Sequence, residues 1–168
     1  CVLRNNQGKQ YGALYLAGGT NAHAIIYGNT ARNGGATGGG VSMTGGVLKH
    51  ATLWGNRAGN DPSDTGATGG GLWHNNGIVT NCIAWNNSLA PMSGEQTYGP
   101  DVYSSATTKI SSLCAPSACG VNPITAYPEF TDPAGGDFSL RSSSPCLLAG
   151  GGYVGAEPFN GLAVGMTV

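Results

Sequence analysis

The chain has 168 residues, of which only 9% are charged, and its formal net charge at pH 7 is −1. With so little charge it has no basic surface for nucleic acid or for an anionic membrane, so we expect neither partner. No apolar run approaches the roughly 18 residues that a membrane-spanning helix needs, so we expect no transmembrane segment. The 30 glycines follow no three-residue period, which excludes collagen, and the aliphatic content is too high for a disordered linker.

Three blocks of the sequence share one internal spacing. Each begins at a glycine and ends at an asparagine 17 positions later, and the blocks span residues 12–29, 39–56 and 70–87. The intervals from one asparagine to the next block vary between 6 positions (12 − 6) and 14 positions (70 − 56). A constant frame with loops of variable length is typical of a solenoid.

Within a block the side chains alternate with period two. Around position 52, Ala51 and Leu53 are small or aliphatic, whereas His50, Thr52 and Trp54 differ in kind. This alternation predicts β-strands, and the glycine pairs between them supply corners with positive φ. Short strands joined by corners, with coils stacked about 4.8 Å apart, form a parallel β-helix.

The asparagine that ends each block predicts a ladder along the solenoid. Asparagine adopts a left-handed backbone readily, and its side-chain amide bonds to neighbouring coils. The expected ladder comprises Asn6, Asn29, Asn56 and Asn87.

The repeats are expected to fill residues 1–113, and the chain opens inside a repeat, so we expect the C-terminal part of a longer solenoid. A fourth copy, aligned on Gly99, has Asp101 where the earlier copies carry an inward aliphatic residue. Residues 114–168 are expected to form a disulfide loop followed by an irregular cap, because the ends of solenoids expose unpaired strand edges.

Two of the five cysteines, Cys114 and Cys119, enclose a loop of four residues. Their spacing predicts a disulfide, which implies an oxidising compartment. Cys1 and Cys82 occupy inward repeat positions three coils apart, so they are expected to be small buried side chains. The pattern assigns no role to Cys146.

The C-terminal segment carries four short motifs in succession. They are Pro-x-Phe-x-Asp-Pro from Pro128, Gly-Asp-Phe-x-Leu from Gly136, Ser-Pro-Cys from Ser144 and Gly-Ala-Glu from Gly155. Together with glycine-rich repeats that end in aromatic-Gly-Asn, they resemble choice-of-anchor Q domain proteins. These are bacterial surface proteins of the pectin-lyase-like superfamily.

The resemblance implies an all-β, right-handed parallel β-helix with an irregular C-terminal capping segment, export from the cell and attachment to its surface. The chain departs from the family pattern before Glu157, where an aromatic residue is usual. The family implies no single activity, because one fold supports many functions.

The superfamily includes polysaccharide lyases, which need a catalytic base and often carboxylates that bind calcium. Asp61 and Asp64 are close in sequence, but they suit a solvated turn better than a calcium site. His23 and His50 share a repeat position beside Lys49, and we interpret them as ordinary outward polar residues. No catalytic residue is therefore assigned, and no cofactor is expected apart from this weak calcium candidate.

One outward face is apolar. Tyr27, Trp54 and Trp85 form one row, and Ile25 and Ile83 lie in the row beside it. An exposed strip of this size predicts a contact, with the chain's own C-terminal segment, with another subunit or with sugar rings. One coil separates the aromatic residues, which is less than the distance between successive sugars and argues against a glycan.

Two functions remain. The first is an extracellular or cell-surface structural or adhesive protein that assembles through the apolar strip or through an open coil edge, with other subunits or the extracellular matrix as partners. The alternative is a polysaccharide lyase or a glycan-binding module. The first is favoured, because no catalytic cluster is recognised.

Overall fold

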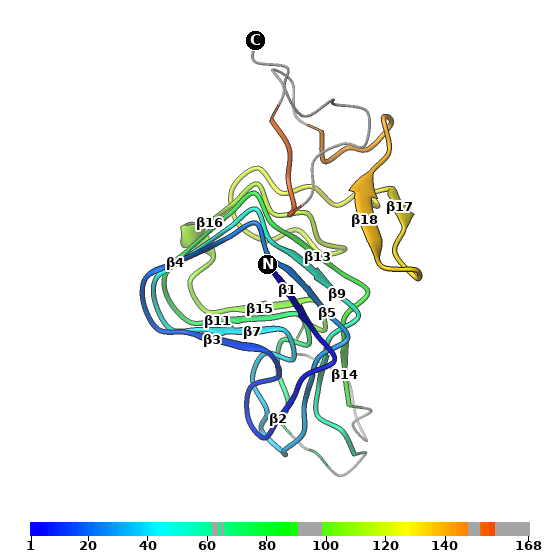
Figure 1. The fold of residues 1–168 in the computed structure, drawn as a ribbon. Coiled ribbons are helices and arrows are strands. Elements are labelled where there is room, and N and C mark those ends of the chain that lie inside the picture. Colours follow the sequence, from blue (N-terminus) through cyan, green and yellow to red (C-terminus); the bar gives the residue numbers. More distant parts are fainter. Residues whose placement is uncertain (62–63, 65, 91–98, 148–151, 157–168) are drawn as a thin grey trace.

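The computed structural model describes residues 1–61, 64, 66–90, 99–147 and 152–156. It confirms an all-β protein built on a parallel β-solenoid (Figure 1). A short 3-10 helix, η1 (Thr107–Lys109), interrupts the strands in the last coil. Within the described residues, no helix is both long and apolar enough to cross a membrane.

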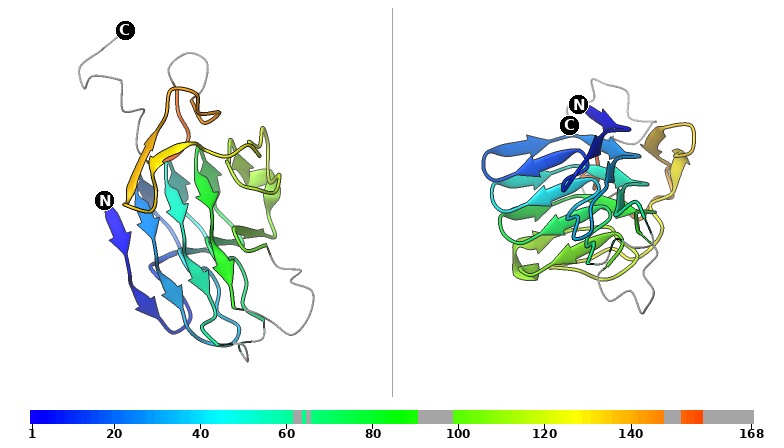
Figure 2. Two further views of the ribbon diagram at one scale, coloured as in Figure 1. Left: turned by 90° about the vertical axis from the view of Figure 1, so that its right-hand side faces the viewer. Right: turned by 90° about the horizontal axis from the view of Figure 1, so that it is seen from below.

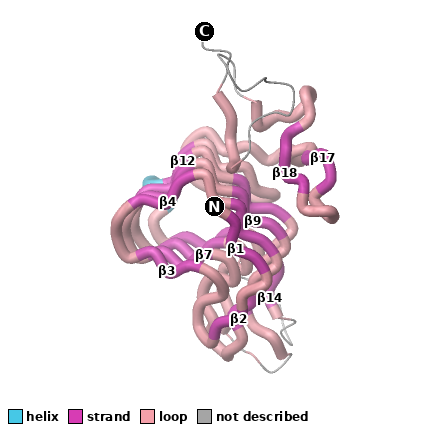
Figure 3. The backbone as a smooth tube through the Cα atoms, in the orientation of Figure 1, coloured by secondary structure: helices cyan, strands magenta, loops and turns pink. Residues whose placement is uncertain are grey.

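Each coil contributes one strand to each of four parallel sheets, which we name A to D in the order in which the chain visits them. Figure 3 shows that the strands keep the same positions from coil to coil. Sheet A contains β1 (Val2–Arg4), β5 (Ile25–Tyr27), β9 (Thr52–Trp54) and β13 (Ile83–Trp85). Sheet B contains β2 (Gln7–Gly8), β6 (Thr30–Ala31), β10 (Arg57–Ala58) and β14 (Ser88–Leu89).

Sheets C and D follow the variable loops. Sheet C contains β3 (Leu14–Leu16), β7 (Val41–Met43), β11 (Leu72–His74) and β15 (Val102–Ser104). Sheet D contains β4 (Thr20–Ala22), β8 (Val47–Lys49), β12 (Ile78–Thr80) and β16 (Ile110–Ser111).

The corners of each coil need left-handed backbone. Between sheets C and D this is supplied by glycines, of which Gly46 has φ = 76°. Between sheets D and A the same conformation falls on His23, His50, Asn81 and Ser112, with φ between 48° and 53°. Histidine and asparagine tolerate this region better than β-branched residues do. His23 and His50 are therefore bend residues of the coil.

The interior is a column of aliphatic side chains drawn from sheets A, C and D. In sheet A the central residue of each strand faces inward, and Ile26, Leu53 and Ala84 are fully buried and adjacent in register. The flanking residues of each strand point to the outside, as the pleat of a strand requires. The repeat frame therefore fixes which side chains reach each outer face.

The C-terminal segment lies beside the solenoid. After the last coil, β17 (Phe130–Asp132) and β18 (Asp137–Leu140) form an antiparallel hairpin. Figure 2 shows the hairpin standing against the outside of sheet A. Residues 121–124 instead run along the last coil, where Val121 and Ile124 form bridges to Ser111 and Cys114. The C-terminal segment thus pairs with the last coil through residues 121–124 and covers the flank of sheet A with its hairpin.

Candidate functional site

The four asparagines of the expected ladder lie in the turns between sheets A and B and form one hydrogen-bonded row. Each Nδ2 donates to the Oδ1 of the next coil's asparagine at 2.9 Å, in three steps from Asn6 through Asn29 and Asn56 to Asn87. The backbone N–H of each donor bonds to the same oxygen at 2.9–3.1 Å. Asn29 and Asn56 are fully buried. The row therefore satisfies polar groups in the dry turn between sheets A and B.

Asp101 ends this row. Its Oδ1 accepts the backbone N–H and the Nδ2 of Asn87 at 2.8 and 2.9 Å. The position expected for Asp101 was wrong by one residue, because Val102 and not Asp101 pairs with Leu72. Burial raises the pKa of the Asp101 carboxyl, and the two bonds from Asn87 oppose that rise. A carboxylate only accepts hydrogen bonds, so it closes the row without an unpaired donor.

The outward aromatic residues of sheet A lie under the C-terminal hairpin. The ring of Tyr27 lies 5.3 Å from that of Phe138, and Trp54 meets Phe130 edge to face at 5.6 Å. Trp85 contacts Tyr127 at 5.7 Å, also edge to face. Three contacts were expected as alternatives for this strip: the chain's own C-terminal segment, another subunit or sugar rings. The structure shows the C-terminal segment in contact with it.

The neighbouring row of sheet A is covered by residues 154–156. Ile25 and Ile83 are buried in the same cluster as Val154 and Ala156. Between them in register, Thr52 accepts the backbone N–H of Ala156 on its Oγ1 at 2.9 Å. The five residues expected to make contacts therefore all face the cap, which is formed by residues 127–147 and 152–156; they are Tyr27, Trp54, Trp85, Ile25 and Ile83.

The predicted Cys114–Cys119 disulfide is not present in the structure, in which all five cysteines are free. The chain alternates across the wall of the solenoid here, so Leu113 and Ala115 face the interior cluster while Cys114 faces the cap. Cys119 packs against the interior cluster. The two thiols therefore lie on opposite sides of the wall, although only four residues separate them in the sequence.

The histidine pair also supports the cap. The rings of His23 and His50 stack at 5.0 Å with an interplanar angle of 6°. Tyr153 packs on His50 at 5.1 Å, and its hydroxyl lies 3.4 Å from His23 Nδ1. Burial, followed by the charges of His23 and Lys49, lowers the pKa of His50. The two histidines therefore contact Tyr153 of the same chain, and they form part of the bend between sheets D and A.

Asp64 has the contacts of a turn. Its Oδ2 accepts the backbone N–H groups of Asn60 and Asp61 at 2.6 and 2.9 Å. Residues 62, 63 and 65 of this loop lie outside the described residues. Across the ranges that the structure describes, no group of three or more His, Cys, Asp or Glu side chains is placed to hold a metal ion.

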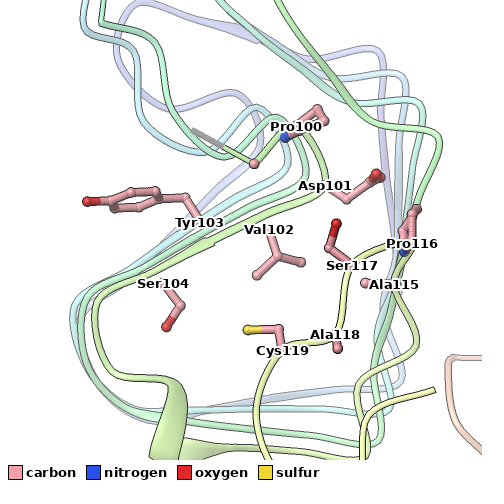
Figure 4. Close-up of a pocket in the computed structure, with 11 residues that line it drawn as sticks. Pro100, Asp101, Val102, Tyr103, Ser104, Ala115, Pro116, Ser117, Ala118 and Cys119 are labelled. Atoms are coloured by element: carbon pink, nitrogen blue, oxygen red, sulfur yellow. The ribbon is translucent and has the colours of Figure 1, made fainter. Parts of the chain in front are cut away.

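A cavity of about 310 Å³ opens at the end of the last coil, between β15 and residues 115–119 (Figure 4). Figure 4 shows the Cys119 sulfur and the Val102 side chain inside this coil, while Tyr103 points away from it. Asp101 is the only charged side chain among the described residues that line the cavity. Ser104 Oγ is bonded to His74 Nδ1 at 2.8 Å, so this hydroxyl is already engaged with the protein.

A second aromatic row, which the sequence interpretation missed, lies on the outer face of sheet C. Tyr15, Ser42, Trp73 and Tyr103 are adjacent in register, and the ring of Tyr11 stacks on Tyr15 at 4.7 Å. Tyr15 is 47% exposed, and Trp73 and Tyr103 are half-buried. The equivalent position is aromatic in the first and third blocks, but it is Ser42 in the second block, so the aromatic row is not obvious in the sequence. We call this surface the sheet C face.

Among the described residues, the sheet C face and the cavity of the last coil are two surfaces that are open to an outside molecule. Comparison with known proteins found no family model, no curated protein and no solved structure that matches the chain. The chain is therefore placed by its fold alone, as an all-β protein built on a parallel β-solenoid.

Proposed function

We propose that the chain is a structural or adhesive module of an extracellular or bacterial cell-surface protein, and that the sheet C face is its contact surface. The observation that carries the proposal is the row of Tyr15, Trp73 and Tyr103 on a rigid parallel sheet. Aromatic side chains supply much contact area with little loss of conformational entropy, and exposed aromatic groups commonly mark contact surfaces.

The remaining polar and aromatic groups support this assignment because they serve the fold. Asn87 and Asp101 close the asparagine row, and the aromatic strip of sheet A is packed under the cap. In the hairpin, Asp137 accepts the Ser139 hydroxyl at 2.6 Å, and Asp132 accepts the backbone N–H of Gly135 at 3.0 Å. These carboxylates hold turns, which leaves the sheet C face as the aromatic surface without a described cover.

A relationship to choice-of-anchor Q domain proteins, with their right-handed coils, is part of the same proposal. The four C-terminal motifs support it, because each places a residue in the cap. Phe130, Phe138, Cys146 and Ala156 come from the four motifs in turn, and all are buried against sheet A. Export and surface attachment follow from this relationship.

Assembly of subunits is proposed through the coil edge. The strip on sheet A contacts the cap, so it is not offered to another subunit. In each sheet the N-terminal strand, β1 to β4, is the outermost one and has its second edge unpaired within the described residues. Such an edge binds a further strand through its backbone groups, from a preceding coil of the same solenoid or from another subunit.

The experiment compares binding of the protein, of a Tyr15→Ala/Trp73→Ala variant and of an Ile78→Ser control to insoluble polysaccharides and extracellular-matrix proteins. Ile78 is a matched control, because it is 52% exposed on the neighbouring sheet D. We expect the double variant to lose at least tenfold in affinity and the control to bind as the wild type does. Equal binding by all three would contradict the proposed contact surface.

A glycan-binding module or polysaccharide lyase is the second candidate, and the position of Ser42 favours it. Ser42 lies between Tyr15 and Trp73 in register, so the strands that carry these two residues are two coil rises apart, about 9.6 Å. For this pair, the objection raised by the one-coil spacing on sheet A does not apply. Ultraviolet absorbance of unsaturated products, measured on uronic-acid polymers, distinguishes a lyase from a module that only binds.

A further inference from the structure

Cys114 is the fourth member of the outward row of sheet A that faces the cap. In register it follows Ile25, Thr52 and Ile83. Its backbone N–H donates to Cys82 O at 2.9 Å, and its carbonyl accepts the N–H of Ala84 at 2.9 Å. The side chain is fully buried within the cluster formed by the cap. The last coil therefore holds this thiol rigidly under the cap.

Cys146 belongs to the cap, and two local bonds fix its backbone. Its N–H donates to Ser144 Oγ at 3.1 Å, and its carbonyl accepts the N–H of Val154 at 2.8 Å. The Ser144 hydroxyl donates in turn to the carbonyl of Pro128. Cys146 is also fully buried, in the same cluster as Cys114. The Ser-Pro-Cys motif thus brings this cysteine back to the wall of the solenoid.

The two thiols are neighbours in this buried cluster, where the Cys114 thiol donates to Ala126 O at 3.5 Å. The nearby Cys146 thiol, followed by burial, raises the pKa of Cys114. The environment of Cys119 is different, because it packs on the interior cluster and lines the cavity of the last coil. We propose that Cys114 and Cys146 form a disulfide that joins the last coil to the cap.

The reaction is thiol–disulfide exchange with an external disulfide, either oxidised glutathione or a thiol–disulfide oxidoreductase. One cysteine, as the thiolate, attacks the external disulfide and releases a thiol. The second cysteine then displaces the other half from the mixed disulfide. The cysteines lose two electrons and two protons, and the external disulfide is reduced to two thiols. Burial suppresses the thiolate in the folded chain, so exchange precedes docking of the cap.

The bond closes a loop of 33 residues, from 114 to 146, that includes the whole hairpin. A crosslink of this length restricts the unfolded chain and holds the cap near sheet A when its contacts open. A dry cluster also shields the bond from reductants, as in structural disulfides of exported proteins.

Tryptic mapping tests the pairing directly. Trypsin cuts after Lys109 and Arg141, which gives one peptide, 110–141, with Cys114 and Cys119, and another, 142–168, with Cys146. The protein is refolded with oxidised and reduced glutathione, alkylated in denaturant without reductant and digested. We expect the two peptides to be crosslinked in the wild type and in Cys119→Ala, and separate in Cys114→Ala. A crosslink within peptide 110–141, or full alkylation of all thiols, would overturn the proposal.

Thermal unfolding of the wild type gives a second measurement that does not depend on the folding of any variant. Reduction of the oxidised protein is expected to lower the midpoint by roughly 5–15 °C. The Cys119→Ala protein should show the same shift. No shift in the wild type, or loss of the shift in Cys119→Ala, would contradict the Cys114–Cys146 pairing.

Discussion

Asn87 gives both its backbone N–H and its Nδ2 to one oxygen of Asp101, at 2.8 and 2.9 Å. The solenoid's polar row therefore ends on a residue that has no side-chain donor when ionised. An asparagine at position 101 would accept the same two bonds but would leave its own NH₂ at the end of the row. The acidic residue is thus explained by its place in the fold.

We predict that Asp101→Asn alters the pH dependence of stability. The folded state raises the pKa of Asp101, so this group favours folding at low pH. The contribution is complete below the ordinary aspartate pKa and is lost as the pH rises through the folded value. The unfolding free energy of the wild type should therefore fall relative to that of Asp101→Asn as the pH rises from 3 to 7. Parallel curves from urea titrations would show that burial of the carboxyl has no such effect.

Replacement of a central ladder residue should be strongly destabilising. Asn56→Ala removes the acceptor of two Asn29 bonds and the donor to both Asn87 and Ile26 O. Because all of these groups are buried, we expect a loss of about 2–5 kcal/mol in unfolding free energy. Asn6→Ala, at the exposed first position, is the matched control and should lose less than about 1 kcal/mol. Equal losses in urea unfolding would argue against a buried ladder.

Gly155 is predicted to be essential for docking of the cap. It has φ = 103°, and a Cβ there would lie 2.7 Å from Ile83 Cδ1 and 3.0 Å from Thr52 Oγ1. Gly155→Ala should detach residues 154–156 and increase the fluorescence of a dye that binds exposed apolar surface. Gly18→Ala is the control, because a Cβ there meets no atom within 4 Å. If both variants behave as the wild type does, this contact is not tight.

Trp54→Ser should lower stability without changing the oligomeric state. Trp54 packs on Phe130 at 5.6 Å and on Phe138 at 6.1 Å, so its loss opens a gap under the hairpin. We expect a loss of about 2–4 kcal/mol, measured by chemical unfolding, and an unchanged mass in light scattering. Trp73→Ser, on the sheet C face, should change the stability far less. A change in mass for Trp54→Ser would instead indicate a subunit interface at the strip.

The repeat spacing was sufficient to predict the solenoid, because strand pairing between coils depends only on a constant frame. It also places Tyr27, Trp54 and Trp85 on one outward row. The pairing proposed for Cys114 could not be predicted this way, because it depends on where the segment that carries Cys146 folds back. Proximity in sequence favoured Cys119, although the alternation through Leu113 and Ala115 places Cys114 on the outer side. The fourth coil was misaligned because its register follows Pro100 rather than Gly99.

The sheet C face was missed for a different reason. Its aromatic residues occur in the first, third and fourth coils, whereas the second coil has Ser42. A pattern based on residues shared by all blocks therefore passes over it. Sequence spacing indicates which rows are formed, but the cap determines which aromatic row stays open.

The most direct test of the proposed contact surface is hydrogen exchange of the protein with and without a polysaccharide or matrix protein that it binds. We expect binding to slow exchange in β3, β7, β11 and β15, with little change in β5, β9 and β13, which the cap covers. Protection confined to residues 99–104 and 115–119 would place the contact in the cavity of the last coil. That result would contradict the assignment of the sheet C face.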